Sequence, residues 1–114
     1  MHITSLTTTA TEQLDAARAA SSGLAARTIF GGHEHSLRQT LIALVADSEL
    51  AEHESPGEAT LQVVLGRVRL AAGEDGVDLG TGDHATIPDT RHSLLALEDA
   101  VVLLTVSKRD VPAG

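Results

Sequence analysis

The sequence predicts an all-β domain, an antiparallel sandwich or barrel preceded by a short N-terminal helix. Three observations lead to this prediction. After residue 24, apolar residues recur in short runs that have the two-residue period of strands. Glycine or aspartate stands between these runs at nearly even spacing, which is typical of antiparallel sheets. Before residue 24, the spacing and the end signals are those of a helix.

The segment of residues 1–24 is the predicted helical part of the chain. Thr9 and Glu12 have the spacing of a capping box, and Gly23 supplies a stop signal after two serines. Leu14 and Ala17 share the apolar stripe of such a helix. A helix of this length is only marginally stable alone, so we expect it to pack on the β-domain.

Residues 25–108 are predicted to form the barrel, and residues 109–114 a polar tail. Residues 73–76 (GEDG) are predicted to form a tight turn, with Asp75 and Gly76 as its strongest signal. The strands are expected at residues 26–30, 37–47, 50–54, 59–65, 67–72, 77–79, 84–87, 92–97 and 101–107.

The core is predicted from the apolar positions of these strands, because a buried aliphatic side chain stabilises the fold by about 1.5–3 kcal/mol. Charged residues at alternate positions are assigned to the outer face. The predicted core residues are Val63, Val64, Leu70, Ile87, Leu94, Val102, Leu104 and Val106.

The length and composition fit a single domain with an aliphatic interior. The chain has 114 residues, enough for one hydrophobic core and too few for a second domain. Cysteine is absent, which excludes disulfides, thiolate metal ligands and a cysteine nucleophile. Tryptophan and tyrosine are absent as well, and Phe30 is the only phenylalanine. The walls of any ligand pocket must therefore be aliphatic.

The charge and the hydropathy pattern exclude two classes of partner. The formal net charge is −8, and Lys108 is the only lysine. Such a chain repels phosphate backbones and lacks the aromatic side chains on which bases stack, so we expect no nucleic-acid partner. The apolar runs are too short to span a bilayer and no signal peptide is recognisable, so we expect no membrane partner and a cytoplasmic location.

Two stretches carry a more specific pattern. The first runs from His53 to Gly66, where a histidine and acidic residues precede a strand that ends in glycine. The second is GDHATIPDTRH, from Gly82 to His92. Together they resemble the two sequence motifs of the cupin family, over the region of residues 37–106. The resemblance implies a double-stranded β-helix, the jelly-roll barrel, which agrees with the strand pattern.

The resemblance carries over only part of the family's metal site. His53 matches the first histidine of the first motif, and His92 matches the histidine of the second. Ser55 stands where the second histidine belongs, and Ala59 where the glutamate belongs. The asparagine that follows the second motif would fall at Ala96. Two of the four usual ligands are therefore present.

Two histidines leave most coordination positions of a divalent metal to water, so a site for Fe, Mn, Ni or Zn would be weak or incomplete. His84 or Glu58 could supply a third ligand. Glu58 should point outward and Ala59 inward if the strand is regular, and a bulge would reverse this. The face of His84 stays open at this stage. As a metal-free pair, the two imidazoles could bind an anionic or carbonyl ligand, or act as acid and base.

The predicted pocket draws on both motifs and on the strands between them. Its expected lining is His53, Ser55, Leu61, Val63, His84, His92 and Leu94. Catalytic residues cannot be assigned from this pattern.

Two other pairs of polar residues are expected outside the pocket. His33 and His35 have a workable spacing for a metal, but they follow two glycines and are expected in an exposed loop. Arg67 and Arg69 alternate with apolar residues, so both are expected on the outer face, paired with acidic residues of a neighbouring strand.

The function that these observations favour is the binding of a small molecule in the barrel, with at most a weak metal site. The alternative is a metal-dependent enzyme of the oxygenase, isomerase or lyase type that uses His53, His92 and a third ligand. A non-catalytic sensor or accessory subunit is a third interpretation, so enzymatic activity stays open. We also expect a homodimer, because small jelly rolls often cover an edge strand by pairing, here through residues 26–30.

Overall fold

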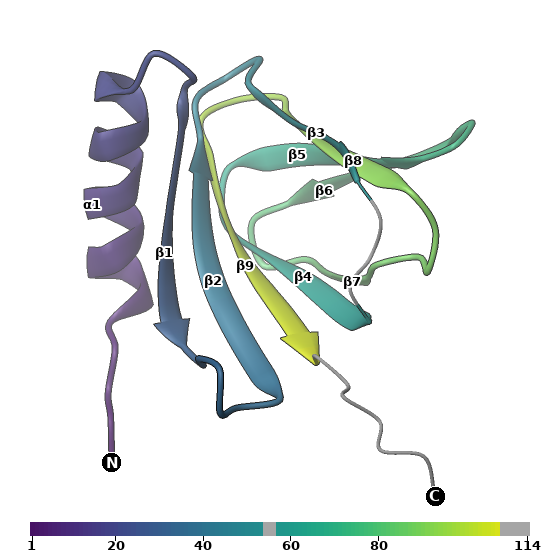
Figure 1. Cartoon of the computed structure of the whole chain (residues 1–114). Coiled ribbons are helices and arrows are strands. Elements are labelled where there is room, and N and C mark those ends of the chain that lie inside the picture. The colour runs from purple at the N-terminus through teal and green to yellow at the C-terminus, as the bar shows by residue number, and fades with distance from the viewer. Residues whose placement is uncertain (54–56, 108–114) are drawn as a thin grey trace, which may run out of the picture.

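The computed structural model describes residues 1–53 and 57–107, and for Glu52 and His53 it describes the backbone only. The described chain forms a helix followed by strands in two facing layers (Figure 1). The elements are α1 (Leu6–Ala19), β1 (Leu24–Phe30), β2 (Leu37–Leu44), β3 (Glu49–His53), β4 (Glu58–Leu65), β5 (Arg67–Ala72), β6 (Asp75–Gly80), β7 (His84–Thr86), β8 (His92–Ala96) and β9 (Ala100–Ser107). The expected tail, residues 109–114, lies outside the described residues.

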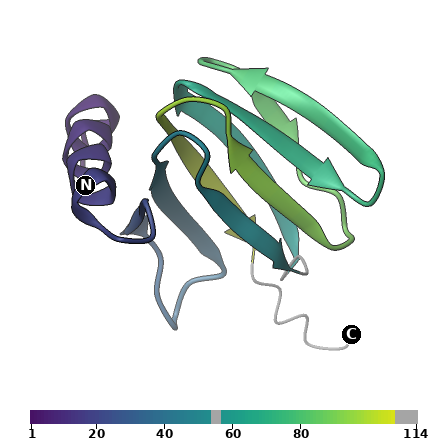
Figure 2. The same cartoon turned by 90° about the horizontal axis from the view of Figure 1, so that it is seen from above.

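The strands form two antiparallel sheets. The first has the order β1-β2-β9-β4-β7, and the second has the order β3-β8-β5-β6. Strands that are distant in the sequence pair side by side, as in a jelly roll, where the chain crosses repeatedly between two sheets. Seen from above, the helix lies beside the first sheet and the second sheet lies on its other side (Figure 2). The predicted all-β fold with an N-terminal helix is confirmed.

The helix begins earlier than the sequence pattern predicts. Ser5 is its N-cap, and the Ser5 hydroxyl accepts a hydrogen bond from the backbone N–H of Thr8 at 3.2 Å. The capping box predicted from Thr9 and Glu12 is therefore wrong, and Thr9 is buried inside the helix. Serine and threonine are both favoured at N-caps, so the residue type alone does not choose between Ser5 and Thr9. Among the described residues, this helix is too short and too polar to cross a bilayer.

The helix packs against the outer face of the first sheet, where it covers β1, β2 and β9. Leu14 and Ala17, predicted to share a stripe, are both buried there. This outer cluster comprises Ala10, Leu14 and Ala17 of the helix with Leu41, Ala43, Val101 and Leu103 of the sheet. Because apolar residues occupy both faces of β9, that strand is buried on both sides.

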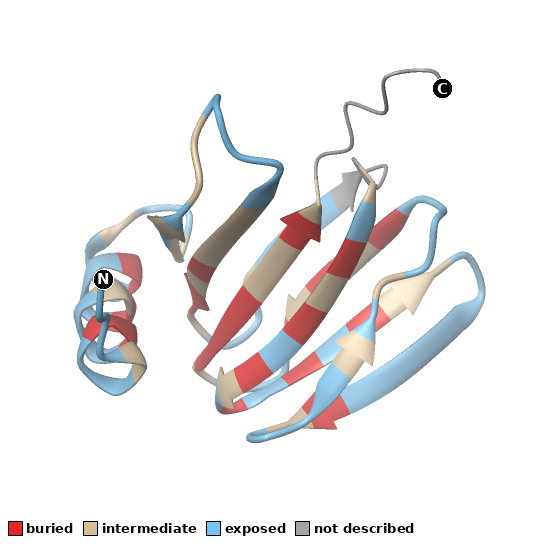
Figure 3. Cartoon of the chain, turned by 90° about the horizontal axis from the view of Figure 1, so that it is seen from below, coloured by how far each residue is buried: buried red, intermediate tan, exposed pale blue. Residues whose placement is uncertain are grey.

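The main core lies between the two sheets (Figure 3). Of the residues predicted for the core, Val63, Leu70, Leu94, Val102 and Val106 are at most 5% exposed. Ile87 and Leu104 are half-buried and pack against this core. Val64 is also half-buried, but it packs against the outer cluster, because neighbouring strand residues point to opposite faces.

The β5–β6 hairpin turns within the predicted segment of residues 73–76, at its first two residues and not at its last two. Ala72 pairs with Asp75, which leaves Gly73 and Glu74 as the two turn residues. Gly73 has φ +61°, the positive value that the first central residue of a type II′ turn requires. Asp75 and Gly76 belong to β6 instead, so the prediction of a turn at these two residues is wrong.

Candidate functional site

His92 is a buried imidazole of the barrel. It is only 5% exposed and is, with Thr9, one of the buried polar residues in the described part of the chain. It begins β8, which lies between β3 and β5 in the second sheet. The sequence places it there because the Pro88–Arg91 loop ends and an alternating apolar strand begins at this residue.

The space beside His92 is small and apolar. A cavity of about 30 Å³ is bounded by His92 together with Ile42, Leu50, Leu61, Leu70, Ile87, Leu94 and Leu104. A cavity of this size has room for about one water molecule. Leu61 and Leu94 therefore lie where the pocket prediction placed them. Val63 belongs to the same core but does not border this cavity.

The hydrogen bond of His92 fixes the tautomer of its neutral ring. The His92 Nδ1 atom lies 3.0 Å from the carbonyl oxygen of Thr90. Because a carbonyl oxygen can only accept, Nδ1 must carry the proton and donate. In the neutral ring Nε2 is then the atom with the lone pair, which is the form that accepts a hydrogen bond or ligates a metal.

The backbone register brings the two motif histidines together. His53 ends β3 and lies directly opposite His92 on β8, after an irregularity that follows Leu50. Residues opposite each other on antiparallel strands share one face of the sheet, with Cβ atoms about 4.5–5.5 Å apart in regular pairs. The side chain of His53 and all of Ser55 lie outside what the structure describes. The sequence therefore identified two strand positions that are neighbours in space.

The two candidate third ligands lie on the outer face of the first sheet. Ala59 is buried and pairs with buried Val106, so Glu58, its neighbour in β4, faces outward and is exposed. His84 pairs with Gln62, and both residues are exposed. This arrangement confirms the outward direction predicted for Glu58. It differs from the position in the pocket predicted for His84.

The described residues do not complete a metal centre of three or four ligands. Ala59 and Ala96 are buried at the positions where the family motifs carry glutamate and asparagine, and a methyl group offers no donor atom. Among the side chains that the structure describes, no group of three histidines or carboxylates could hold a metal ion.

The other polar pairs lie on the surface. His33 and His35 are exposed in the β1–β2 loop, as expected, and the His35 ring lies 5.0 Å from the ring of Phe30. Arg67 and Arg69 are exposed on β5. Arg69 pairs with Asp78 of β6 across a distance of 2.7 Å, which confirms the predicted cross-strand pairing for Arg69 and lowers the pKa of the Asp78 carboxyl, whereas Arg67 lies opposite Gly80.

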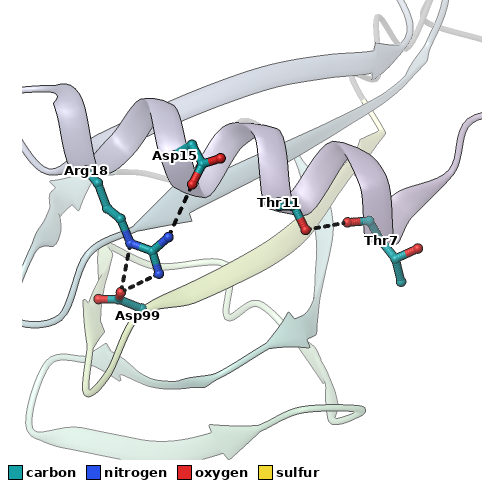
Figure 4. Close-up of polar contacts among 5 residues, drawn as sticks. All are labelled: Thr7, Thr11, Asp15, Arg18 and Asp99. Atoms are coloured by element: carbon teal, nitrogen blue, oxygen red, sulfur yellow. Dashed lines mark hydrogen bonds and ion pairs between the residues drawn. The ribbon is translucent and has the colours of Figure 1, made fainter.

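Sequence reasoning missed one polar contact and one cleft. The contact joins Arg18 of the helix to Asp99 of the β8–β9 turn (Figure 4). The cleft, of about 540 Å³, lies at the ends of β2, β4, β7 and β9 and is lined by several threonines, among them Thr60 and Thr105. Neither feature has a local signature, because each depends on residues that only the strand pairing brings together.

Comparison with known proteins identifies the fold. No protein-family model and no curated protein matches the sequence. A cupin superfamily protein from Desulfitobacterium hafniense matches with a TM-score of 0.70 at 13% identity, over 75% of this chain and 78% of that protein. An RmlC-like cupin from Shewanella frigidimarina matches with a TM-score of 0.68 at 20% identity, over 80% and 81% of the two chains.

The chain has the cupin jelly-roll fold. A third similar structure is a conserved protein of unknown function from Streptococcus pyogenes, with a TM-score of 0.71 and 24% identity, over 81% of this chain and 80% of that one. At these identities the likeness concerns the fold, and the activity must be argued from the residues of this cupin barrel.

Proposed function

We propose that this cupin barrel binds a small molecule beside His92, with at most a weak metal site. The observation that supports this proposal is the tautomer of a buried imidazole in an otherwise aliphatic wall. In the neutral ring, Nε2 accepts a hydrogen bond from a ligand hydroxyl. When the ring is protonated, Nε2 donates to a carboxylate or carbonyl oxygen instead.

The size of the cavity limits the ligand. A volume of about 30 Å³ accommodates an organic molecule only if wall side chains move. Leu50 and Ile87 are half-buried, so they can rearrange at lower cost than the fully buried members of the core. The ligand class that fits best is therefore a compact aliphatic acid or carbonyl compound with one polar end directed at His92.

A thermal-shift screen tests this proposal. Small carboxylates and carbonyl compounds are compared on the native protein and on His92→Leu, in which an apolar side chain replaces the imidazole among aliphatic neighbours. We expect stabilisation of the native protein and none of the variant. His84→Ala, which removes an exposed imidazole on the outer face, serves as the matched control and should respond like the native protein. Equal stabilisation of His92→Leu by the same compound would contradict the proposal.

For the metal, we propose weak binding that involves both motif histidines, on the basis of the His53–His92 pairing. Titration of tag-free protein with Zn²⁺ or Mn²⁺ should give a low affinity, and the His53→Ala/His92→Ala double variant should abolish it. Stoichiometric tightly bound metal in the purified protein would instead favour the metal-dependent enzyme. Metal that persists in the double variant would point to His33 and His35.

We propose in addition that the protein forms a homodimer along β1. This strand is at the edge of the first sheet, and Phe30 at its end is 44% exposed. An edge strand that presents unpaired backbone groups favours pairing with a second copy. Sedimentation equilibrium of the native protein should give twice the monomer mass, and Thr28→Pro should shift the population to monomer. A monomeric native protein at high concentration would rule this proposal out.

A further inference from the structure

A cleft at one end of the first sheet lies outside the barrel. It has a volume of about 540 Å³, within the range of small-molecule sites and far above that of the cavity beside His92. It lies where β2 and β4 begin and where β7 and β9 end, strands that are labelled in Figure 1. The helix packs on other parts of the same outer face, so it leaves this end of the sheet uncovered.

A row of hydroxyl groups crosses the floor of this cleft. Thr105 of β9 lies directly opposite Thr60 of β4, which in turn lies opposite Thr86 of β7. Neighbouring strands are about 4.8 Å apart, so the three positions form a line about 10 Å long. They share the outer face, because the adjacent residue Leu61 is buried in the inner core.

The hydrogen bonds of this row leave capacity for a ligand. Gln39 donates from Nε2 to the Thr105 hydroxyl at 3.2 Å, so this oxygen is held in place and keeps a further lone pair. The Thr60 and Thr86 hydroxyls bond to none of the residues that the structure describes. Because the hydroxyl oxygens are held at the fixed spacing of the strands, they can accept hydrogen bonds from a ligand whose donor groups are spaced along a linear molecule.

The charge of the cleft favours a positively charged ligand. The exposed Asp89 lines it, and the lining residues in the described ranges include no cationic side chain. The whole chain carries a formal net charge of −8, which adds to the negative potential. The cleft therefore repels anions. A cation is attracted by the long-range negative potential and can also contact a carboxylate.

Apolar surface is interleaved with these groups. Leu37 is 40% exposed at one side of the cleft, and Ile87 is half-buried at another. A compact hydrated metal ion makes no use of such surface, whereas methylene groups do. We infer that this cleft binds a linear aliphatic polyamine, with ammonium groups on the threonine hydroxyls and the Asp89 carboxylate, and methylenes on Leu37 and Ile87.

Calorimetric titration with spermidine tests the inference, because its three amines are separated by short methylene chains. The native protein should bind one equivalent, more weakly as salt is raised. Thr60→Val/Asp89→Asn removes one hydroxyl and one carboxylate while a β-branched residue is kept in the strand, and it should weaken binding by about tenfold or more. Asp75→Asn makes the same charge change on the exposed β6 and should bind like the native protein.

Three results would overturn the inference. The first is that spermidine does not bind, or binds equally to the native protein and to the double variant with an unchanged melting temperature. The second is that Mg²⁺ at equal concentration displaces spermidine, which indicates unspecific attraction to an acidic surface. The third is that amide NMR shifts on titration concentrate around His92 and not around Thr60, Thr86 and Thr105. Since the barrel site and this cleft respond to different variants, either can fail independently.

Discussion

Arg18 and Asp99 connect the N-terminal helix to the barrel across 81 positions of sequence. The Arg18 guanidinium donates to the Asp99 carboxylate from Nη2 at 3.0 Å and from Nε at 3.3 Å. The other carboxylate oxygen of Asp99 accepts from the backbone N–H of Ala46 at 2.9 Å. One side chain in the β8–β9 turn therefore holds both the helix and the chain that follows β2. Its contact with Arg18 is drawn in Figure 4.

A double-mutant cycle measures the strength of this connection. Arg18→Ala and Asp99→Ala, separately and combined, should give a coupling free energy of about 0.2–1 kcal/mol, since both side chains are partly exposed to water. Asp99→Ala should cost more than Arg18→Ala, because it also leaves the Ala46 N–H without its acceptor. Urea unfolding provides the free energies. Coupling of zero, with equal single effects, would show that the contact does not fix the helix.

The same carboxylate predicts an acid-dependent loss of stability. The Ala46 N–H, and then the Arg18 guanidinium, hold the pKa of Asp99 below its ordinary value of 3.8. A group whose pKa is lower in the folded state stabilises the fold above the unfolded pKa, and this contribution is lost as pH falls through the folded pKa. The urea midpoint should therefore drop below about pH 4, and less steeply in Asp99→Asn.

The control for the acid experiment is Asp78→Asn. The pKa of Asp78 is also lowered, mainly by its hydrogen bond from Arg69, but this pair lies on the exposed β5–β6 hairpin and does not hold the helix. The variant should keep the part of the pH dependence that belongs to Asp99. If Asp99→Asn and the native protein give parallel profiles from pH 6 to pH 3, the assignment to Asp99 is incorrect.

The two faces of β4 predict opposite responses to one substitution. Val63 is fully buried between the sheets, whereas its neighbour Gln62 is exposed. Val63→Asp would bury a carboxylate among aliphatic side chains, and we expect it to unfold the domain. Gln62→Asp should change the melting temperature by only a few degrees. Circular dichroism decides between these outcomes, and a folded Val63→Asp protein would require a different register for β4.

Much of the fold could be predicted because the strands alternate apolar and polar residues, and this alternation assigns each residue to a face. That rule placed Val63 inside and Glu58 outside, as observed. It could not choose the helix start between Ser5 and Thr9, because both residue types cap a helix.

Less of the candidate site could be predicted from the sequence, because the site depends on which strands pair. The motif spacing predicted that His53 and His92 approach each other, and their pairing across β3 and β8 agrees with this. The face of His84 could not be derived, since a three-residue strand offers too little alternation. No regular spacing in the sequence marks the row of threonines, because its members become neighbours only through the register of three strands.

The glycine that ends the first motif provides a final prediction. Gly66 has φ +86° in the tight β4–β5 connection, a value that costs an L-residue roughly 1–2 kcal/mol. A Cβ atom on Gly66 would lie 2.8 Å from the Ala100 Cα and closer still to the Asp99 carbonyl oxygen. Gly66→Ala should therefore add an overpacking cost of about 1–3 kcal/mol to this strain.

Gly73 is the matched control for that substitution. Its φ is +61°, but a Cβ atom there would meet no other atom within 4 Å. Gly73→Ala should then cost only the backbone strain, roughly 1–2 kcal/mol, and Gly66→Ala clearly more. Thermal unfolding of the two variants gives the comparison. Equal losses in melting temperature would show that the β8–β9 turn moves aside without cost, and that Gly66 is required for its backbone angle alone.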